Sequence, residues 1–319
     1  PASEELLAAL GDDQTTVRRR AVRALAELGP RVIDDLVSIV KDVGDDRREE
    51  AASVLAAIGR PAAAKLEPVL SASNLHVRRA AARALREMGW EALPAADGLL
   101  NAATHRDDET ARVAREALSR LGDAGLPRLE KALAADSKRE RGAAIDVLAE
   151  MGAPALEVLR KSLAHESARV RSAAATAIGR MGGRGAWVAE ELANALDDPN
   201  QQVAGDAAAA LVAIGPGAVP ALERLMKGDN AELAKRAGEC LARIGGPATE
   251  AAGSALASDR AEVRRVAAGV LMQVGPAGRA QIKALVGSLA DEDPSVRSRA
   301  RRALLEAGWA AVGPLVDAL

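Results

Sequence analysis

Apolar residues recur along this 319-residue chain with a helical period, and a glycine follows each long apolar-periodic stretch. Ten such glycines stand 30 or 33 residues apart, always in the order 30, 30 and 33, so that every third one is 93 residues further on. This spacing predicts ten repeated units and indicates triplication of a three-unit block. The glycines are Gly29, Gly59, Gly89, Gly122, Gly152, Gly182, Gly215, Gly245, Gly275 and Gly308.

The residues before each glycine predict the longer helix of each unit. Alanine stands eight residues before the glycine in all ten units, and leucine or isoleucine stands four before it. Together with the apolar residue directly before the glycine, these positions form one stripe of a helix. The small alanine lets a neighbouring helix approach closely, and we expect the glycine to provide a left-handed cap at the helix end.

A shorter apolar-periodic stretch follows each glycine and ends in an acidic or polar turn, such as Asp12-Asp13 or Asp198-Pro199-Asn200. Each unit is therefore predicted to be helix, turn and longer helix. In the units of 33 residues, the three extra residues fall in the first helix or in the loop before it. We expect one continuous all-α array over residues 1–319, with an N-terminal unit, three blocks (30–122, 123–215 and 216–308) and a final unpaired helix over 311–319.

The turn acid and a following Val-Arg pair, as in Asp13 with Val17-Arg18 and Asp259 with Val263-Arg264, resemble HEAT repeats. The short unit is most similar to the HEAT-like repeats of bacterial phycobilisome-lyase-type proteins. This resemblance covers the whole chain and implies a right-handed α-solenoid of about ten helix pairs, with the second helices lining its inner surface. It also implies that the repeated arginine pairs with the turn acid of its own or the neighbouring unit.

That arginine stands eleven residues before the glycine in seven of the ten units, and two interpretations of the row are open. Seven aligned arginines are typical of a phosphate-binding ladder. The resemblance implies instead that they tie the stack together, and the acids five residues earlier favour this structural role. The arginines are Arg18, Arg48, Arg78, Arg141, Arg171, Arg264 and Arg297.

Composition narrows the function further. The formal net charge is -2, which favours neither nucleic acid nor an anionic membrane for the chain as a whole. No apolar run approaches the length that a membrane span needs, and the start of the sequence has no signal-peptide character, although a leader before Pro1 could have been removed. The single Cys240 excludes an intramolecular disulfide and is compatible with a reducing compartment, so the cytoplasm is the favoured location.

Residues that could carry chemistry are sparse. His76, His105 and His165 lie in turns of different units without a second ligand at metal spacing, so no metal, cofactor or enzymatic activity is predicted. Cys240 occupies a row of small apolar residues and is predicted to be a buried packing residue. The chain has no Phe or Tyr, and its three tryptophans are expected to cover helix junctions. Trp187 is the preferred candidate if one of them anchors a partner.

The inner surface should carry the function. Positions ten, nine and six residues before each glycine lie off the apolar stripe and are expected to face the inner surface. They are charged and mixed in units one to four, small and mildly acidic in units five to seven and basic in units eight to ten. This predicts a shallow central trough flanked by charged walls or, alternatively, only tight curvature. The candidate partner-binding residues are Asp146, Ser172, Thr176, Asp206, Arg236, Arg265, Arg299, Arg302 and Trp187.

These features favour a non-catalytic scaffold that binds a protein or peptide on the inner surface. Two alternatives stay open: a subunit of a bilin-lyase-like modifying enzyme, and binding of nucleic acid or an anionic surface through the basic last units. The final helix carries Val312, Leu315, Val316 and Leu319 without a second helix to cover them. We therefore expect either that the chain is a segment of a longer array or that this end contacts another copy.

Overall fold

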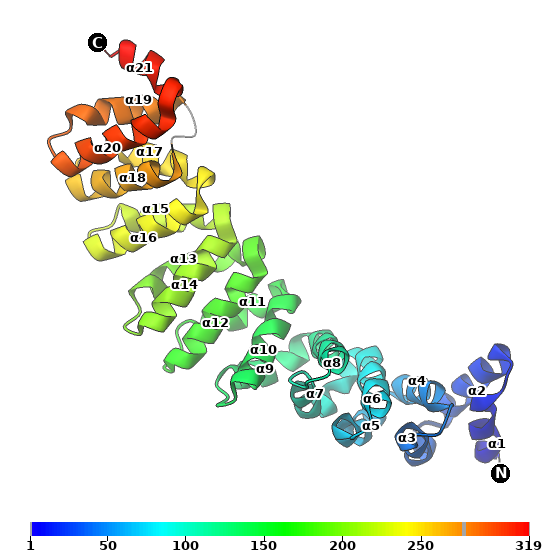
Figure 1. Cartoon of the computed structure of the whole chain (residues 1–319). Helices are drawn as coiled ribbons and strands as arrows, with labels where there is room; N and C mark the ends of the chain where they lie inside the picture. The colour runs from blue at the N-terminus through cyan, green and yellow to red at the C-terminus, as the bar shows by residue number, and fades with distance from the viewer. Residues whose placement is uncertain (1, 276–278, 319) are drawn as a thin grey trace. The chain divides into compact units, whose positions relative to one another are not determined.

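The computed structural model describes residues 2–275 and 279–318, and in those ranges it contains helices and no strand. A shorter first helix and a longer second helix alternate through ten successive pairs, and α21 (Val312–Val316) follows the last pair (Figure 1). The all-α solenoid expected from the sequence is thereby confirmed.

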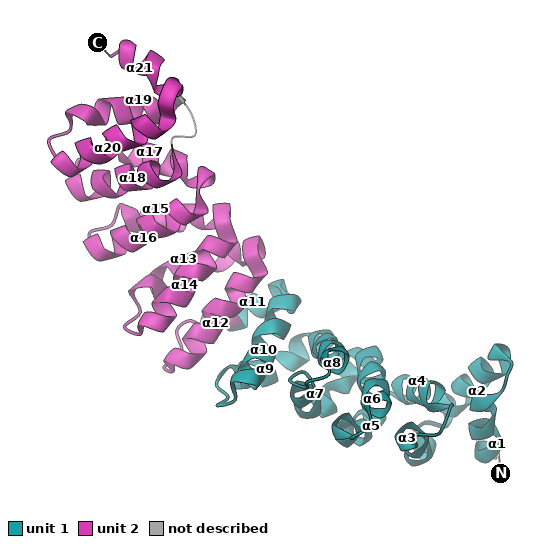
Figure 2. Ribbon diagram, in the orientation of Figure 1, with its two compact units in different colours: residues 1–158 teal, residues 159–319 magenta. Residues whose placement is uncertain are grey.

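The helix pairs form two compact units, residues 1–158 and 159–319, and the boundary falls within α11 (Ala153–Ser162) (Figure 2). The continuity of three blocks along one right-handed superhelix stays a prediction. The helices of the first unit are α1 (Ala2–Ala8), α2 (Thr15–Leu28), α3 (Ile33–Lys41), α4 (Arg48–Ile58), α5 (Arg60–Leu66), α6 (Leu75–Met88), α7 (Ala96–Ala102), α8 (Asp108–Arg120), α9 (Leu126–Leu133) and α10 (Lys138–Met151). Those that follow α11 are α12 (Ala168–Met181), α13 (Ala189–Asn194), α14 (Gln201–Ile214), α15 (Val219–Met226), α16 (Ala231–Ile244), α17 (Thr249–Ala255), α18 (Ala261–Val274), α19 (Arg279–Gly287) and α20 (Pro294–Ala307).

Two layers of helices make up each compact unit. Second helices pack on one another, as α2, α4, α6 and α8 do in the first unit and α12, α14, α16, α18 and α20 do in the second. First helices form the other layer and pack both on their own second helix and on the next first helix, as α13 does on α14 and α15. No pair encloses a core alone, so each depends on its neighbours for burial of its apolar stripe.

All ten repeat glycines have positive φ, between 54° and 81°, and no other residue type in the described ranges does. The predicted left-handed cap is only partly correct. At Gly29, for example, φ is 60° and ψ is -133°, which lies outside the left-handed helical region. This combination is accessible essentially to glycine alone, and that explains why no unit substitutes it.

The alanine and leucine rows form the core that their spacing predicts. Each of the ten alanines eight residues before the glycine is at most 2% exposed, and the residues four before it are at most 6% exposed. The alanines lie in the interior of the array, where a side chain without γ-atoms leaves room for close packing of the helices. Cys240 is 2% exposed in the neighbouring row, which confirms its predicted packing role.

The longer units place their extra residues before the first helix, as predicted. A seven-residue 3-10 segment follows the glycine at Gly89–Ala95 and again at Gly182–Val188, where ordinary units such as Gly29–Val32 have four residues. The corresponding segment after Gly275 lies in part outside the described residues.

Replacing Ala174 by leucine should lower stability by about 1–3 kcal/mol, because the added atoms enter a contact that is already closed. Thermal unfolding followed by circular dichroism measures the shift. Ala213→Leu, at an exposed position of α14, is the matched control and should leave the midpoint nearly unchanged. Equal midpoints for the two variants would contradict the assigned packing of this row.

Candidate interaction surface

The repeated arginines bind main-chain carbonyl groups in the turn before their own helix. Arg171 Nη1, for example, donates to the carbonyl oxygens of His165 and Glu166, each at 2.8 Å. All seven arginines make the same pair of contacts, to the residues six and five positions earlier. Within its own unit the arginine therefore binds the backbone of the turn. The resemblance had implied a pair with the turn acid of its own or the neighbouring unit.

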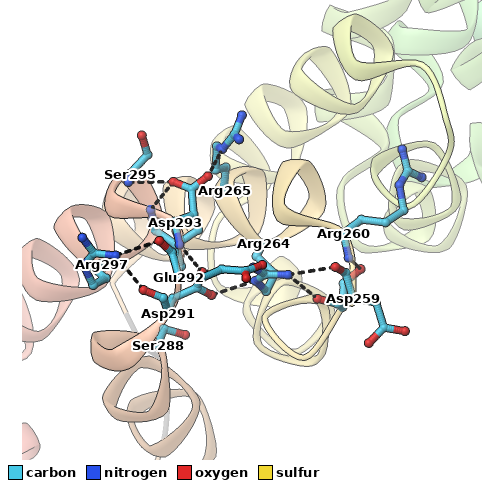
Figure 3. Close-up of polar contacts among 12 residues, drawn as sticks. Asp259, Arg260, Arg264, Arg265, Ser288, Asp291, Glu292, Asp293, Ser295 and Arg297 are labelled. Atoms are coloured by element: carbon cyan, nitrogen blue, oxygen red, sulfur yellow. Dashed lines mark hydrogen bonds and ion pairs between the residues drawn. The ribbon is translucent and has the colours of Figure 1, made fainter.

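Two of these arginines also bind a carboxylate of the neighbouring turn. Arg171 donates to both carboxylate oxygens of Asp198, at 2.6 and 2.9 Å, and Arg264 does the same to Asp291, at 2.7 and 3.0 Å. Figure 3 shows Arg264 between its own turn at Asp259 and the next turn at Asp291. These pairs are almost fully buried, and the guanidinium groups hold the pKa of both aspartates below the ordinary value. The structural interpretation of these arginines is supported over a phosphate ladder.

The first block lacks this carboxylate. Arg78 stands 93 residues before Arg171, but the position that corresponds to Asp198 is His105. Arg78 is 8% exposed, and its Nε is buried without a hydrogen-bond partner among the residues that the structure describes. His105 Nδ1 still accepts from the Asp107 amide, as Asp198 accepts from the Asn200 amide, so only the charge-assisted contact is missing.

The predicted trough residues of the second unit lie close together. Ser172 Oγ donates to Asp206 across the α12–α14 contact, Gln202 Nε2 donates to the other oxygen of Asp206 at 2.9 Å, and Thr176 donates to the Ser172 carbonyl at 2.9 Å. Asp206 therefore already accepts hydrogen bonds within the fold on both carboxylate oxygens, which leaves fewer acceptor sites for a ligand. Asp146 is half-buried and belongs to the first unit, so it is not grouped with them.

One of the three rows assigned to the inner surface is partly misplaced. Ala143 and Ala173, nine residues before their glycines, are 4% and 5% exposed. The interaction between Ser172 and Asp206 shows why: position ten of one unit meets position nine of the next, so this row lies between adjacent second helices.

The predicted basic wall is largely occupied by contacts between units. Arg236 donates to the Leu196 carbonyl at 2.6 Å, Arg265 binds Asp293 at 2.5 Å, and Arg299 donates to the Arg265 carbonyl at 2.6 Å. Arg302 is exposed. These arginines tie α16 to the turn at Leu196, α18 to the turn before α20, and α20 to α18, and the carboxylate of Asp293 offsets the charge of Arg265.

A groove between α14 and α16 was not predicted as such. It has a volume of about 550 Å³, and its floor includes Ala204, Gly205, Ala208 and the buried edge of Cys240. Burial raises the pKa of the Cys240 thiol to about 11, so it is a poor nucleophile at neutral pH. The small residues of α14 were the available signal, but their sequence pattern does not show how far apart the two helices lie.

Charged side chains of both signs line this groove. Asp197, Glu239 and Arg243 are exposed and have no ion pair among the described residues, whereas Arg236 crosses the groove to the Leu196 carbonyl. The groove thus combines a small-residue floor with unpaired charges, which suits the side chains of a peptide better than a compact ion.

The tryptophans lie in the connections that follow second helices, and all three are exposed: Trp90 by 59%, Trp187 by 64% and Trp309 by 90%. The expectation that they cover helix junctions is wrong for most of their surface. Trp187 lies in the 3-10 segment Gly182–Val188 and not on a second helix, so it does not belong to the groove.

No group of three or more His, Cys, Asp or Glu side chains that could hold a metal occurs in residues 2–275 and 279–318. One segment, Gln201–Met226, is long and apolar enough for a membrane span by length and composition, with a mean hydropathy of 1.4. The expectation that no run approaches this length is wrong by that measure. In the structure the segment is α14 and α15 joined at Gly215, whose φ is 72°, and this makes it weak evidence for a span.

The sequence matches HEAT repeats over residues 3–71, 126–212 and 219–305, and the PBS lyase HEAT-like repeat over residues 77–104. The HEAT-repeat match covers more than half of the chain and agrees with the helix-pair architecture. The chain belongs to the HEAT-repeat family.

No curated protein matches this sequence. Among solved structures, the chain is similar to an engineered protein at 23% identity over 96% of this chain and 98% of that one, with a TM-score of 0.34. It is also similar to the karyopherin Kap121p bound to the extreme C-terminus of the protein phosphatase Cdc14p, at 14% identity and a TM-score of 0.47, and to Kap121p bound to Nup53p, at 15% and 0.48. These matches cover 94% and 95% of this chain and 41% of each Kap121p chain, and they are too distant to assign a function.

His105→Asp should stabilise the protein by about 1 kcal/mol, because it gives Arg78 Nε the charge-assisted partner that Asp198 and Asp291 provide in the other blocks. Thermal unfolding measures the gain. His105→Asn keeps an acceptor for the Asp107 amide without the charge and should gain less. If His105→Asp is no more stable than His105→Asn, the missing ion pair of Arg78 does not limit stability, and the prediction is wrong.

Asp198→Asn should lower stability by about 1–3 kcal/mol at neutral pH, because the Arg171 guanidinium keeps a buried position but loses its carboxylate. The pKa of Asp198 is depressed in the folded state, so its contribution is fully present above the unfolded value of about 3.9 and is lost as pH falls through the lower folded value. Urea unfolding between pH 7 and pH 3 should show a constant deficit that narrows at the acidic end. Asp197→Asn, at the exposed neighbouring position, is the control and should show no such pH-dependent deficit.

Proposed function

We propose that this chain is a non-catalytic protein-interaction scaffold that binds a peptide or helix of a partner on the surface of its second helices. The observation that carries the proposal is the groove between α14 and α16, with its floor of small residues and its unpaired charges. Membership in the HEAT-repeat family supports a binding role in general, because stacked helix pairs present long surfaces.

The dimensions of the groove support a peptide as its occupant. A volume of about 550 Å³ accommodates a few side chains, and the floor at Gly205 and Ala208 lets a partner backbone come close to α14. Asp197 on one side and Arg243 on the other would fix the direction of a bound segment through complementary charges. Peptide recognition in grooves of this kind combines side-chain pockets with a few orienting polar contacts.

Nucleic acid is less well supported as a ligand. Three of the four arginines of the predicted basic wall, Arg236, Arg265 and Arg299, already bind groups of the fold, and an exposed acid such as Glu239 lies beside them. Binding to a duplex requires several phosphate contacts from free cations. A bilin-lyase-like subunit stays an alternative that only the PBS lyase HEAT-like match favours.

Self-contact through the C-terminal end also stays a prediction. Val312 and Val316 of α21 are 44% and 63% exposed, whereas Ile33 and Val219, at the position of Val312 in other units, are 5% and 9% exposed. An apolar hollow of about 310 Å³ lies beside them, lined in part by Leu304, Leu305 and Leu315.

Filling the groove should block binding without unfolding the protein. At Gly205 a Cβ atom would have no heavy atom within 4 Å, so a larger side chain can start there without backbone strain. Gly205→Trp is designed to fill the groove and also removes a helix-weakening glycine. Peptides selected from a random display library on the wild-type protein serve as probes. Their dissociation constants, measured by fluorescence anisotropy, should rise at least tenfold in this variant, about 1.4 kcal/mol.

Gly142→Trp is the matched control. Gly142 occupies the same repeat position in α10, also has open space around its Cβ, and does not line the groove. The control should bind the peptides as the wild type does. Failure to select any peptide, or equal loss of binding in both variants, would contradict the proposed use of this groove.

A further inference from the structure

A second groove lies between α2 and α4 in the first unit. It has a volume of about 370 Å³ and is lined by Arg19, Val22 and Arg23 from α2 and by Glu49 and Ser53 from α4, together with Thr15, Arg18 and Glu50. Three arginines and two glutamates therefore lie in one groove, and the individual contacts show which of these charges are paired.

Both glutamates of the groove already face a guanidinium group. Arg18 Nε donates to Glu50 at 2.9 Å, and Arg83 Nη1, from α6, donates to Glu49 at 3.2 Å. The two negative charges of the groove, on Glu50 and Glu49, are therefore paired with Arg18 and Arg83. Arg19 and Arg23 are exposed, and neither has a hydrogen bond or an ion pair from its side chain among the described residues. The groove retains an excess of positive charge.

The repeats themselves show what side chains at these two positions bind. Arg83 occupies the position of Arg23 two units further on, and it binds a carboxylate, that of Glu49. Arg79 occupies the position of Arg19 two units further on, and it binds both oxygens of Asp107 at 2.6 and 3.1 Å.

No internal carboxylate is available for Arg19 in the same way. The position that corresponds to Asp107 in the unit after Arg19 is Gly44, which has no side chain. In this fold, arginines at both positions are thus set up to take a carboxylate, and in α2 both lack one.

We infer that the groove between α2 and α4 binds an acidic segment of a partner polypeptide, with Arg19 and Arg23 each taking a carboxylate. This inference rests on the proposed role of the chain as a binding scaffold and names the chemistry of one occupant. Four residues along a helix span about 6 Å, close to the span of two residues in an extended chain, about 6.6 Å. Glutamates at alternate positions of an extended segment therefore match the spacing of the two arginines, and Val22 between them contacts the intervening side chain.

A polypeptide fits this groove better than a nucleic acid does. The unpaired positive charge of the groove is confined to the two separate positions Arg19 and Arg23, which suits single carboxylates better than a continuous row of phosphates. The lining contains no aromatic side chain on which a base could stack. Two free arginines also provide far fewer contacts than the row of cations that tracks a nucleic-acid backbone.

The test uses the full chain and a fluorescein-labelled octapeptide of alternating glutamate and alanine, with anisotropy measured at low ionic strength. The octapeptide should bind, and the double variant Arg19→Ala/Arg23→Ala should raise its dissociation constant at least tenfold. Arg106→Ala/Arg139→Ala removes the same charge from two exposed arginines outside the groove and should leave the constant within a factor of two. Circular dichroism verifies that both variants keep the helical content of the wild type.

Three outcomes would overturn the inference: no binding of the octapeptide, equal weakening by both double variants, or displacement by an oligothymidylate octamer at a lower concentration than the unlabelled octapeptide requires. The last outcome would assign the groove to phosphates. The proposed function is tested independently of this inference, because its test depends on Gly205 in the second unit. Loss of octapeptide binding with continued sensitivity of library peptides to Gly205→Trp would reject only the acidic-segment assignment.

Discussion

The close approach of successive second helices is the contact on which the rest of the structure depends. Small residues permit this approach: a Cβ atom on Gly179 of α12, for example, would lie only 3.0 Å from the Cα atom of Ala210 in α14. Because one helix pair cannot bury its own stripe, stability is distributed along the array as a series of interfaces between neighbours. The leucines four residues before the glycine fill the space between the two layers, and their complete burial contributes about 1.5–3 kcal/mol each.

The turns between helices are held by arginines that bind in two directions. Within a unit, the guanidinium satisfies two carbonyl groups of the preceding turn, and in two units that precede a long unit it also reaches the turn of that long unit through Asp198 or Asp291. This bidentate geometry needs arginine and would not be reproduced by lysine. The 93-residue period thus appears in the polar contacts as well as in the spacing of the glycines. His105 marks the one block in which the period is broken.

The polar surface of the second helices has two kinds of charge, and the difference governs what it can bind. Arginines that pair with a carboxylate of the next unit, such as Arg264 and Arg265, connect adjacent units and contribute little free charge. Side chains such as Arg19, Arg23 and Arg243 have no internal partner among the described residues and are available to a ligand. The two grooves proposed as binding sites, beside α2 and α14, are places where this internal pairing stops.

The sequence by itself determined the repeat. Glycines with positive φ, alanines at helix contacts and the order of unit lengths are local requirements of each helix pair, so the number of pairs, their order and the buried rows followed from spacing alone. The surface was less predictable, because a residue type does not reveal whether its charge is already used. Ala143 and Ala173 were assigned to the inner surface but lie between helices, and Arg299 was assigned to a partner but binds the Arg265 carbonyl. Those outcomes depend on which positions of adjacent units meet, which is a distance between segments about 30 residues apart and is set only when the helices pack.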